Sequence, residues 1–194
     1  MNTSEAPLKI AVLLGSTRPG RRADAIGDWV IQRAVRREHA KFELVDLAEQ
    51  ALPLLDEPEP AIHGSYTQAH TKAWSERIAG FDGYLFVTPE YNRSIPAALK
   101  NAIDYLYPEW GNKAAGIVSY GVDAGGARAA EHLRCVLGEL HVADVRTTVA
   151  LSLMTEFADG AVDAPAHQVQ KLETLLDQLL SWSAALRTVR RASR

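Results

Sequence analysis

Residues 14–22 are Leu14-Gly15-Ser16-Thr17-Arg18-Pro19-Gly20-Arg21-Arg22, and this stretch decides how the N-terminal part of the chain is interpreted. The apolar run before it, residues 10–14, is short and rich in branched side chains, which is typical of a buried strand. From about residue 24, apolar residues recur every three to four positions, which predicts a helix. A loop that opens a helix presents free backbone N–H groups and the positive end of the helix dipole. Hydroxyls and guanidinium groups in such a loop favour phosphate in particular.

This loop has neither of the common phosphate-binding patterns. It lacks the Gly-Lys-Ser/Thr ending of a P-loop and the Gly-x-Gly-x-x-Gly of a dinucleotide-binding turn. An ordinary strand-to-helix connection with solvated arginines is therefore the alternative interpretation of residues 15–22.

Apolar strands and amphipathic helices alternate about five times along the chain. Continuous apolar strands with helices between them indicate a parallel sheet covered on both faces. Right-handed crossovers then favour an α/β fold, a doubly wound three-layer sandwich with a five-stranded parallel sheet. Strands are expected at residues 10–14, 42–45, 84–87, 114–119 and 142–151, and helices near 24–34, 67–79, 96–106, 133–140 and from about 166.

A long connection, residues 46–66, separates the second strand from the second helix. Connections of this length are often functional lids or partner contacts. Its acidic residues Asp56, Glu57 and Glu59 are expected to be solvated. His63 and His70 lie near its end without the spacing of a metal site.

Length and composition favour one ordinary globular domain, residues 1–194, with frayed tails at 1–7 and 188–194. The net charge of −3, without a basic stripe, favours neither nucleic acid nor an anionic membrane surface as a partner. The single cysteine, Cys135, excludes an internal disulfide framework. No apolar segment approaches the roughly 20 residues that span a bilayer, and no signal-peptide pattern begins the chain, so a cytoplasmic location is expected.

Three loops stand at the carboxyl ends of the expected strands, where doubly wound sheets bind ligands. They are residues 15–24, 89–94 and 119–126, which are also the most chemically distinctive loops of the chain. This agreement predicts one ligand site built from all three.

The second loop, residues 89–94, is a short segment restricted by Pro89 and Pro96. Such a segment can lie along the edge of a planar heterocycle, with Tyr91 as an aromatic wall and Asn92 as a donor and acceptor. The alternative is a turn in which Asn92 or Ser94 caps the following helix.

The third loop, residues 119–126, carries Gly121, Gly125 and Gly126. Glycines allow the main chain to approach a ligand closely, and Tyr120 offers a ring that can cover it. The alternative is a flexible strand-to-helix turn.

Together the three loops resemble those of the NADPH-dependent FMN reductases of the flavodoxin-like fold, a family that includes related quinone, chromate and azo-dye reductases. The matching segments are Gly-Ser-Thr-Arg-Pro-Gly-Arg at 15–21, Pro-Glu-Tyr-Asn at 89–92, and Ser-Tyr-Gly with Gly-Gly at 119–126. Their order and spacing match, and the resemblance covers about residues 8–180. Pro-Glu-Tyr-Asn is the most specific of the three.

The resemblance implies which residues bind FMN. The first loop holds the phosphate in the family, and the other two border the isoalloxazine from its two sides. The implied residues are Ser16, Arg18 and the backbone of Arg21, Arg22 and Ala23 for the phosphate, then Pro89, Glu90, Tyr91 and Asn92, and finally Ser119, Tyr120, Gly121 and Gly125. Which of Arg21 and Arg22 touches the phosphate is open, because many relatives carry hydroxyl or amide residues at the positions of Arg21 and Ala23.

The resemblance also implies the activity of an NAD(P)H-dependent oxidoreductase. A hydride would pass from NADPH or NADH to FMN, and electrons would then pass to a small-molecule acceptor (free FMN, a quinone or similar) by a ping-pong mechanism. No side chain is then needed as nucleophile or general base, and Glu90 is expected to act structurally, through its backbone. Relatives are commonly dimers or tetramers, so a homodimer or homotetramer is expected.

Two other functions fit the same pattern. One is a flavodoxin-like electron carrier without nicotinamide activity, although the mild net charge would give such a carrier only a weak steering field. The other is a binding or scaffold protein on the same fold that has lost its ligand.

Overall fold

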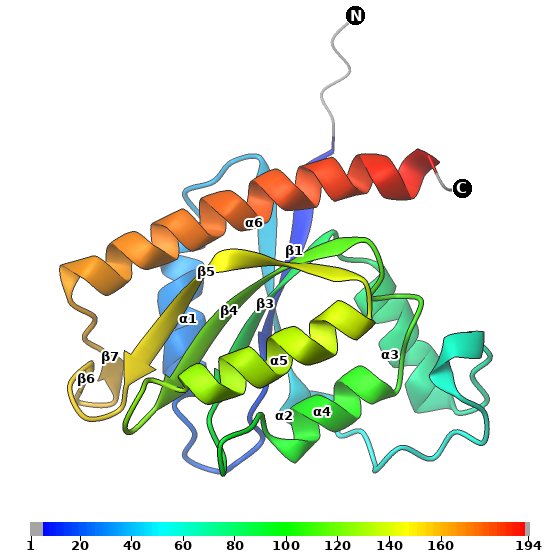
Figure 1. The fold of residues 1–194 in the computed structure, drawn as a ribbon, viewed down its shortest axis with the longest axis horizontal. Helices are drawn as coiled ribbons and strands as arrows, with labels where there is room; N and C mark the ends of the chain where they lie inside the picture. Colours follow the sequence, from blue (N-terminus) through cyan, green and yellow to red (C-terminus); the bar gives the residue numbers. More distant parts are fainter. Residues whose placement is uncertain (1–5, 193–194) are drawn as a thin grey trace, which may run out of the picture.

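The computed structural model describes residues 6–192. Five parallel strands form the central sheet in the order β2-β1-β3-β4-β5 (Figure 1). They are β1 (Leu8–Leu14), β2 (Ala40–Asp46), β3 (Gly83–Pro89), β4 (Lys113–Gly121) and β5 (Val142–Ser152). This is the flavodoxin-like strand order, whose direction of winding reverses between β1 and β3. The predicted five-stranded, doubly wound α/β sandwich is therefore confirmed.

Helices cover both faces of the sheet, as the continuous apolar strands predict. In Figure 1, α6 lies above the sheet and α4 and α5 lie below it. One face packs against α1 (Ala23–Ala34) and α6 (Ala166–Ala192). The other packs against α3 (Ala69–Ala79), α4 (Ala97–Asp104) and α5 (Ala127–Glu139).

Alternation along the strands assigns each side chain to one of two separate cores. Leu13, Phe86 and Ile117 belong to the core under α3, α4 and α5. Their neighbours Leu14 and Val87 belong to the core under α1 and α6. Because successive strand residues point to opposite faces, adjacent residues at the carboxyl edge of the sheet serve different layers.

Three short elements were not expected from the sequence. A single-turn helix, α2 (Leu47–Gln50), follows β2, and a 3₁₀ turn, η1 (Ala61–His63), lies within the long connection. A small antiparallel hairpin, β6 (Phe157–Ala158) and β7 (Ala161–Val162), follows β5.

The expectation that the acidic residues of the long connection are merely solvated is wrong for two of them. The Glu57 carboxylate accepts hydrogen bonds from the backbone N–H groups of Thr67 (2.8 Å) and Gln68 (2.9 Å), just before α3. Asp56 lies 2.9 Å from the Nε2 of His70 and accepts a hydrogen bond from the Tyr105 hydroxyl. Glu57 thus fixes the connection against the backbone that leads into α3.

The predicted frayed C-terminal tail is also corrected where the structure describes it. Helix α6 continues to Ala192, and Arg190 donates to Asp82 (2.6 Å) and to the carbonyl of Asn112 (2.7 Å). Residues 188–192 are thus helical, while residues 1–5 and 193–194 lie outside the described residues. No helix within residues 6–192 is long and apolar enough to cross a membrane.

Candidate functional site

The three predicted loops meet at the carboxyl edge of the sheet, because β1, β3 and β4 are neighbours in it. The Gly15 N–H donates to the Val87 carbonyl (2.9 Å), which joins the first loop to β3. The Glu90 N–H donates to the Tyr120 carbonyl (3.0 Å), which joins the second loop to the third. The topology thus places the predicted loops side by side at the β1/β3 switch point.

Ser16 links the first two loops through its side chain. It is fully buried, and its hydroxyl lies 3.0 Å from the hydroxyl of Tyr91 and 3.4 Å from the backbone nitrogen of Arg18. Hydroxyls at this spacing share a hydrogen bond in which either can donate. The pair therefore holds the first loop against Tyr91.

The N-terminus of α1 opens into this loop without a cap. Arg22 occupies the N-cap position and forms no side-chain cap, and the first hydrogen bond of the helix runs from the Ile26 N–H to the Arg22 carbonyl (3.2 Å). The N–H groups of Ala23, Asp24 and Ala25 therefore have no acceptor within the helix. Such an end attracts an anion.

The side chain of Arg21 is fully engaged inside the protein. Its Nη1 donates to the Ser16 carbonyl (2.5 Å) and to Asp46 Oδ1 (2.7 Å), while its Nη2 donates to Asp46 Oδ2 (2.5 Å) and Asp24 Oδ1 (2.7 Å). Its Nε donates to Asp24 as well (3.0 Å). The hydrogen bonds that Arg21 donates to Asp46 and Asp24 raise the pKa of Arg21 further above its already high value. All five guanidinium N–H donors are used, so the side chain has none left for a ligand.

The other two arginines of the loop differ from Arg21. Arg22 is exposed and its guanidinium lies over the ring of Phe157 in the β6–β7 hairpin, 5.8 Å from the centroid. Arg18 is exposed, and its guanidinium forms no hydrogen bond or ion pair with residues 6–192. Arg18 is thus the one arginine of this loop whose charged group is free.

The second loop is a tight turn of defined type. Tyr91 and Ser94 exchange backbone hydrogen bonds (2.9 and 3.0 Å), and Asn92 and Arg93 between them have φ of 50° and 68°. Two consecutive left-handed residues define a type I′ turn. The alternative in which Asn92 or Ser94 caps α4 is wrong: Pro96 is the N-cap, and the Ser94 hydroxyl instead lies 2.6 Å from Nδ1 of His132.

Glu90 acts structurally through its side chain as well as its backbone. Its carboxylate accepts hydrogen bonds from the backbone N–H (3.1 Å) and the guanidinium (3.0 Å) of Arg128 in the first turn of α5. A carboxylate suits a helix N-terminus, which carries partial positive charge. Glu90 therefore connects the second loop to α5, a side-chain role that the sequence did not indicate.

The glycines of the third loop are required by the protein's own backbone. Gly125 and Gly126 have φ of 59° and 80°, and a Cβ on Gly126 would lie 2.8 Å from the backbone nitrogen of Tyr120. A Cβ on Gly121 would lie 2.9 Å from the nitrogen of Gly126. The buried Ser119 hydroxyl donates to the Gly125 carbonyl (2.8 Å). These residues fold the loop back onto the sheet, so close approach to a ligand is not what requires glycine here.

Tyr120 differs most from its expected role. Its side chain is 4% exposed and packs in the core beneath α1 and α6, so its ring is not available as a cover for a ligand. Its hydroxyl is buried and has no hydrogen-bond partner within residues 6–192. Burial, together with nearby Tyr91, raises the pKa of Tyr120, so the hydroxyl stays protonated.

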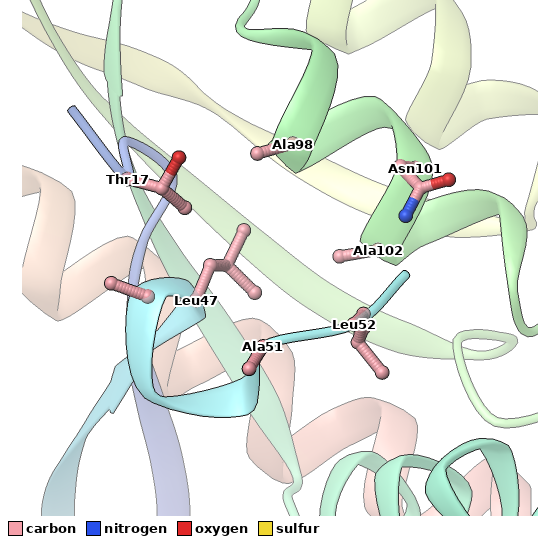
Figure 2. Close-up of a pocket in the computed structure, with 8 residues that line it drawn as sticks. Thr17, Leu47, Ala51, Leu52, Ala98, Asn101 and Ala102 are labelled. Atoms are coloured by element: carbon pink, nitrogen blue, oxygen red, sulfur yellow. The ribbon is translucent and has the colours of Figure 1, made fainter. Parts of the chain in front are cut away.

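A cavity of about 340 Å³ adjoins the first loop (Figure 2). Thr17 of the loop, Leu47 and Ala51 of the segment around α2, and Ala98 and Asn101 of α4 surround it. Asn101 also holds the long connection in place, because its amide donates to the Pro53 carbonyl (2.7 Å). The sequence did not predict that the segment around α2 lines a cavity beside the first loop. The length of the connection 46–66 was the only indication that this segment has a function.

No group of three or more metal-ligating side chains occurs within residues 6–192. The donors that gather at the edge of the sheet are hydroxyls, backbone N–H groups and one free guanidinium. This set fits an anion such as a phosphate ester better than a metal cation.

Comparisons with known proteins agree with this chemistry. Residues 8–156 match the family model described as NADPH-dependent FMN reductase. An NAD(P)H-dependent FMN reductase of Schizosaccharomyces pombe is 45% identical over 84% of this chain and 82% of its own length. A 2-hydroxy-1,4-benzoquinone reductase of a Burkholderia species is 31% identical over 90% of this chain and 96% of its own length. Among solved structures, the flavoenzyme FerB of Paracoccus denitrificans superposes with a TM-score of 0.69 at 24% identity, over 92% of this chain and 98% of that one.

Proposed function

The chain belongs to the NADPH-dependent FMN reductase family, and from this we propose that it binds FMN at the carboxyl edge of its sheet and passes electrons from NAD(P)H to a small-molecule acceptor. The observation that carries the proposal is the contact between Ser16 and Tyr91, whose hydroxyls lie 3.0 Å apart. It joins the loop suited to phosphate to the loop suited to a planar ring at the switch point of the sheet.

The residues of the first loop fit a phosphate monoester. The uncapped N-terminus of α1 supplies backbone N–H donors, and Ser16 and Arg18 add a hydroxyl and a free guanidinium. Asp24 and Asp46 lie close by and would repel a phosphate, but Arg21 pairs with both. We propose that Arg21 and Arg22 contribute to phosphate binding through the backbone at residues 21–23, and not through their side chains.

The second and third loops fit a flat heterocycle. The type I′ turn at 91–94 fixes the segment Pro89 to Asn92, and the hydrogen bond from Glu90 to Tyr120 aligns it with the end of β4. A backbone held this way can pair with carbonyls and ring nitrogens at the edge of an isoalloxazine. We propose that Pro89, Glu90, Tyr91 and Asn92 border one side of the ring and that the 119–126 loop borders the other.

FMN, when bound, supplies the hydride chemistry that protein side chains lack. The contribution of this chain is to bind and orient: the first loop anchors one end, and the second loop fixes the plane of the other. We propose that NAD(P)H and the acceptor take turns at the same open edge, in a ping-pong sequence. The acceptor class is free flavin or a quinone, as the names of the relatives indicate.

We also propose that the protein is a cytoplasmic homodimer or homotetramer whose partners are small molecules. The single cysteine suits a reducing compartment. Sedimentation analysis of the purified protein tests the oligomeric state, and a monomer at micromolar concentration contradicts it.

The test of the function is the absorption spectrum of the purified protein, with and without added FMN, followed by anaerobic NADPH. Flavin bands that bleach on addition of NADPH support the proposed reductase. Bands that persist with both NADPH and NADH indicate the electron carrier instead. A protein that takes up no FMN indicates a scaffold and contradicts the proposed site.

A further inference from the structure

The hydroxyl of Tyr120 is a buried donor that has no acceptor within residues 6–192, and it lies beneath the first loop. Tyr120 is the last side chain of β4 that faces α1 and α6, since Val118 and Tyr120 share that core while Ser119 points to the other side. The same core contains Ala23, the first residue of α1. The phenol therefore extends toward the end of the sheet over which α1 begins.

The hydroxyl of Tyr120 is surrounded by residues of the first loop and by Tyr91 of the second. Ser16 and Tyr91 meet beside it, and the positive charges of Arg18 and Arg21 act on it. The Ser16 hydroxyl is paired with that of Tyr91, and although Tyr120 lies near both, its hydroxyl forms no hydrogen bond of proper geometry with either. Buried polar groups are almost always paired, so an unpaired hydroxyl at a ligand site indicates an acceptor supplied by the ligand.

The side chain of Arg21 does not donate to a ligand at this site. All of its donors are directed to Asp24, Asp46 and the Ser16 carbonyl, so it cannot also serve a bound anion. A phosphate at the α1 N-terminus therefore needs a donor other than the Arg21 side chain, and the Tyr120 hydroxyl, which lies near Ser16 and Arg18, is placed to supply one.

We propose that the Tyr120 hydroxyl donates a hydrogen bond to the phosphate of FMN, from the sheet side, and so makes the site selective for phosphorylated flavin. This inference rests on the proposed function, because it assigns a residue within that site. Tyr120 is then a specificity-determining residue: its ring packs in the core, and its hydroxyl donates a hydrogen bond to the ligand.

The experiment compares FMN and riboflavin binding to the flavin-free protein, measured by quenching of flavin fluorescence. In Tyr120→Phe, FMN affinity should fall roughly ten- to a hundredfold, as expected for loss of a hydrogen bond to a charged group. Riboflavin affinity should stay within about twofold, since riboflavin lacks the phosphate. The matched control is Tyr107→Phe, whose hydroxyl donates to the Glu139 carbonyl away from the loops, and it should change neither affinity.

The outcomes separate this inference from the proposed function. If wild-type protein binds neither flavin, the proposed function fails and Tyr120 with it. If wild-type protein binds FMN and Tyr120→Phe weakens both flavins equally, or neither, only the role of Tyr120 is overturned. A crystal structure of the wild-type FMN complex gives a second test: Tyr120 Oη within hydrogen-bond distance of a phosphate oxygen supports the proposal, and contact with the ribityl chain or the ring overturns it.

Discussion

Arg21 and Asp46 form a bidentate ion pair, with Nη1 to Oδ1 at 2.7 Å and Nη2 to Oδ2 at 2.5 Å, between the loop after β1 and the end of β2. Asp46 also caps α2 by accepting from the Ala48 N–H (2.8 Å). The parallel fork of guanidinium and carboxylate is a strong and directional contact. It fixes the first loop, and together with Asp24 and the Ser16 carbonyl it leaves no Arg21 donor for a ligand.

We expect Arg21→Ala to weaken FMN binding even though its side chain does not reach the ligand. The change leaves Asp24 and Asp46 uncompensated beside the phosphate, and it removes a largely buried pair at a cost of about 2 kcal/mol of folding free energy, between the values for exposed and buried pairs. Urea unfolding and FMN titration measure the two effects. Adding Asp24→Asn and Asp46→Asn to Arg21→Ala should restore much of the affinity, and a triple variant no better than Arg21→Ala would rule out repulsion as the cause.

Acid should weaken the anchoring of the long connection through Glu57. Partial burial raises the pKa of this carboxyl, but hydrogen bonds from Thr67, Thr71 and Gln68 outweigh it and lower the pKa to about 2. A carboxyl whose pKa is depressed on folding stabilises the protein above its unfolded pKa of about 4.5, and that contribution is lost as the pH falls toward 2. Glu57→Ala should therefore be less stable than wild type at pH 7, with the difference shrinking below pH 4.5.

Glu59→Ala is the matched control for Glu57, because Glu59 is exposed in the same segment and forms no hydrogen bond or ion pair with residues 6–192. Its melting temperature should follow that of wild type at every pH. A gap between wild type and Glu57→Ala that stays constant from pH 7 to pH 2.5 would show that packing, and not the charge, accounts for the loss.

Two glycine substitutions distinguish the stability cost of a left-handed backbone conformation from the cost of a steric clash. Gly20 and Gly126 both have left-handed φ (70° and 80°), but a Cβ on Gly20 meets nothing within 4 Å whereas one on Gly126 meets backbone atoms of Tyr120 at 2.8 Å. Gly20→Ala should cost about 1 kcal/mol from conformation alone. Gly126→Ala should cost clearly more, because the backbone of β4 cannot move aside. Equal costs in urea unfolding contradict the contact as the cause.

Much of the fold could be predicted from the apolar runs of the sequence. The strand cores 10–14 and 84–87 are uninterrupted apolar runs, 114–119 is a similar run that ends in Ser119, and each lies within an observed strand. Once the strands are parallel, topology alone brings the loops after β1, β3 and β4 together. The hairpin at 157–162 was missed although Asp159-Gly160, at φ of 49° and 86°, is a common two-residue turn signal. Its strands are two residues each, too short to show alternation.

The orientation of side chains at the site could not be predicted in the same way. Every residue of β4 is buried, so the strand has no polar alternation to indicate which face Tyr120 joins. The three arginines at 18, 21 and 22 are chemically alike, and only the fold brings Asp46 to one of them. The sequence predicted that the three loops lie together, whereas the hydrogen bonds and ion pairs of their side chains depend on contacts between segments far apart in the chain.

Arg18 should be the arginine of the first loop that matters most for ligand affinity. Among the residues that the structure describes, the Arg18 guanidinium has no hydrogen-bond or ion-pair partner. All donors of Arg21 are used by Asp24, Asp46 and the Ser16 carbonyl, and the guanidinium of Arg22 lies over Phe157. Arg18→Ala should weaken FMN by about 1.5–3 kcal/mol, the usual range for a hydrogen bond to a charged group. Arg22→Ala, which removes the same charge from the same loop, should change affinity by less than about 0.5 kcal/mol. Because the two variants alter net charge equally, a similar loss in both would mean that the loop attracts phosphate by its overall field, and a loss in Arg18→Ala alone would mean a direct contact.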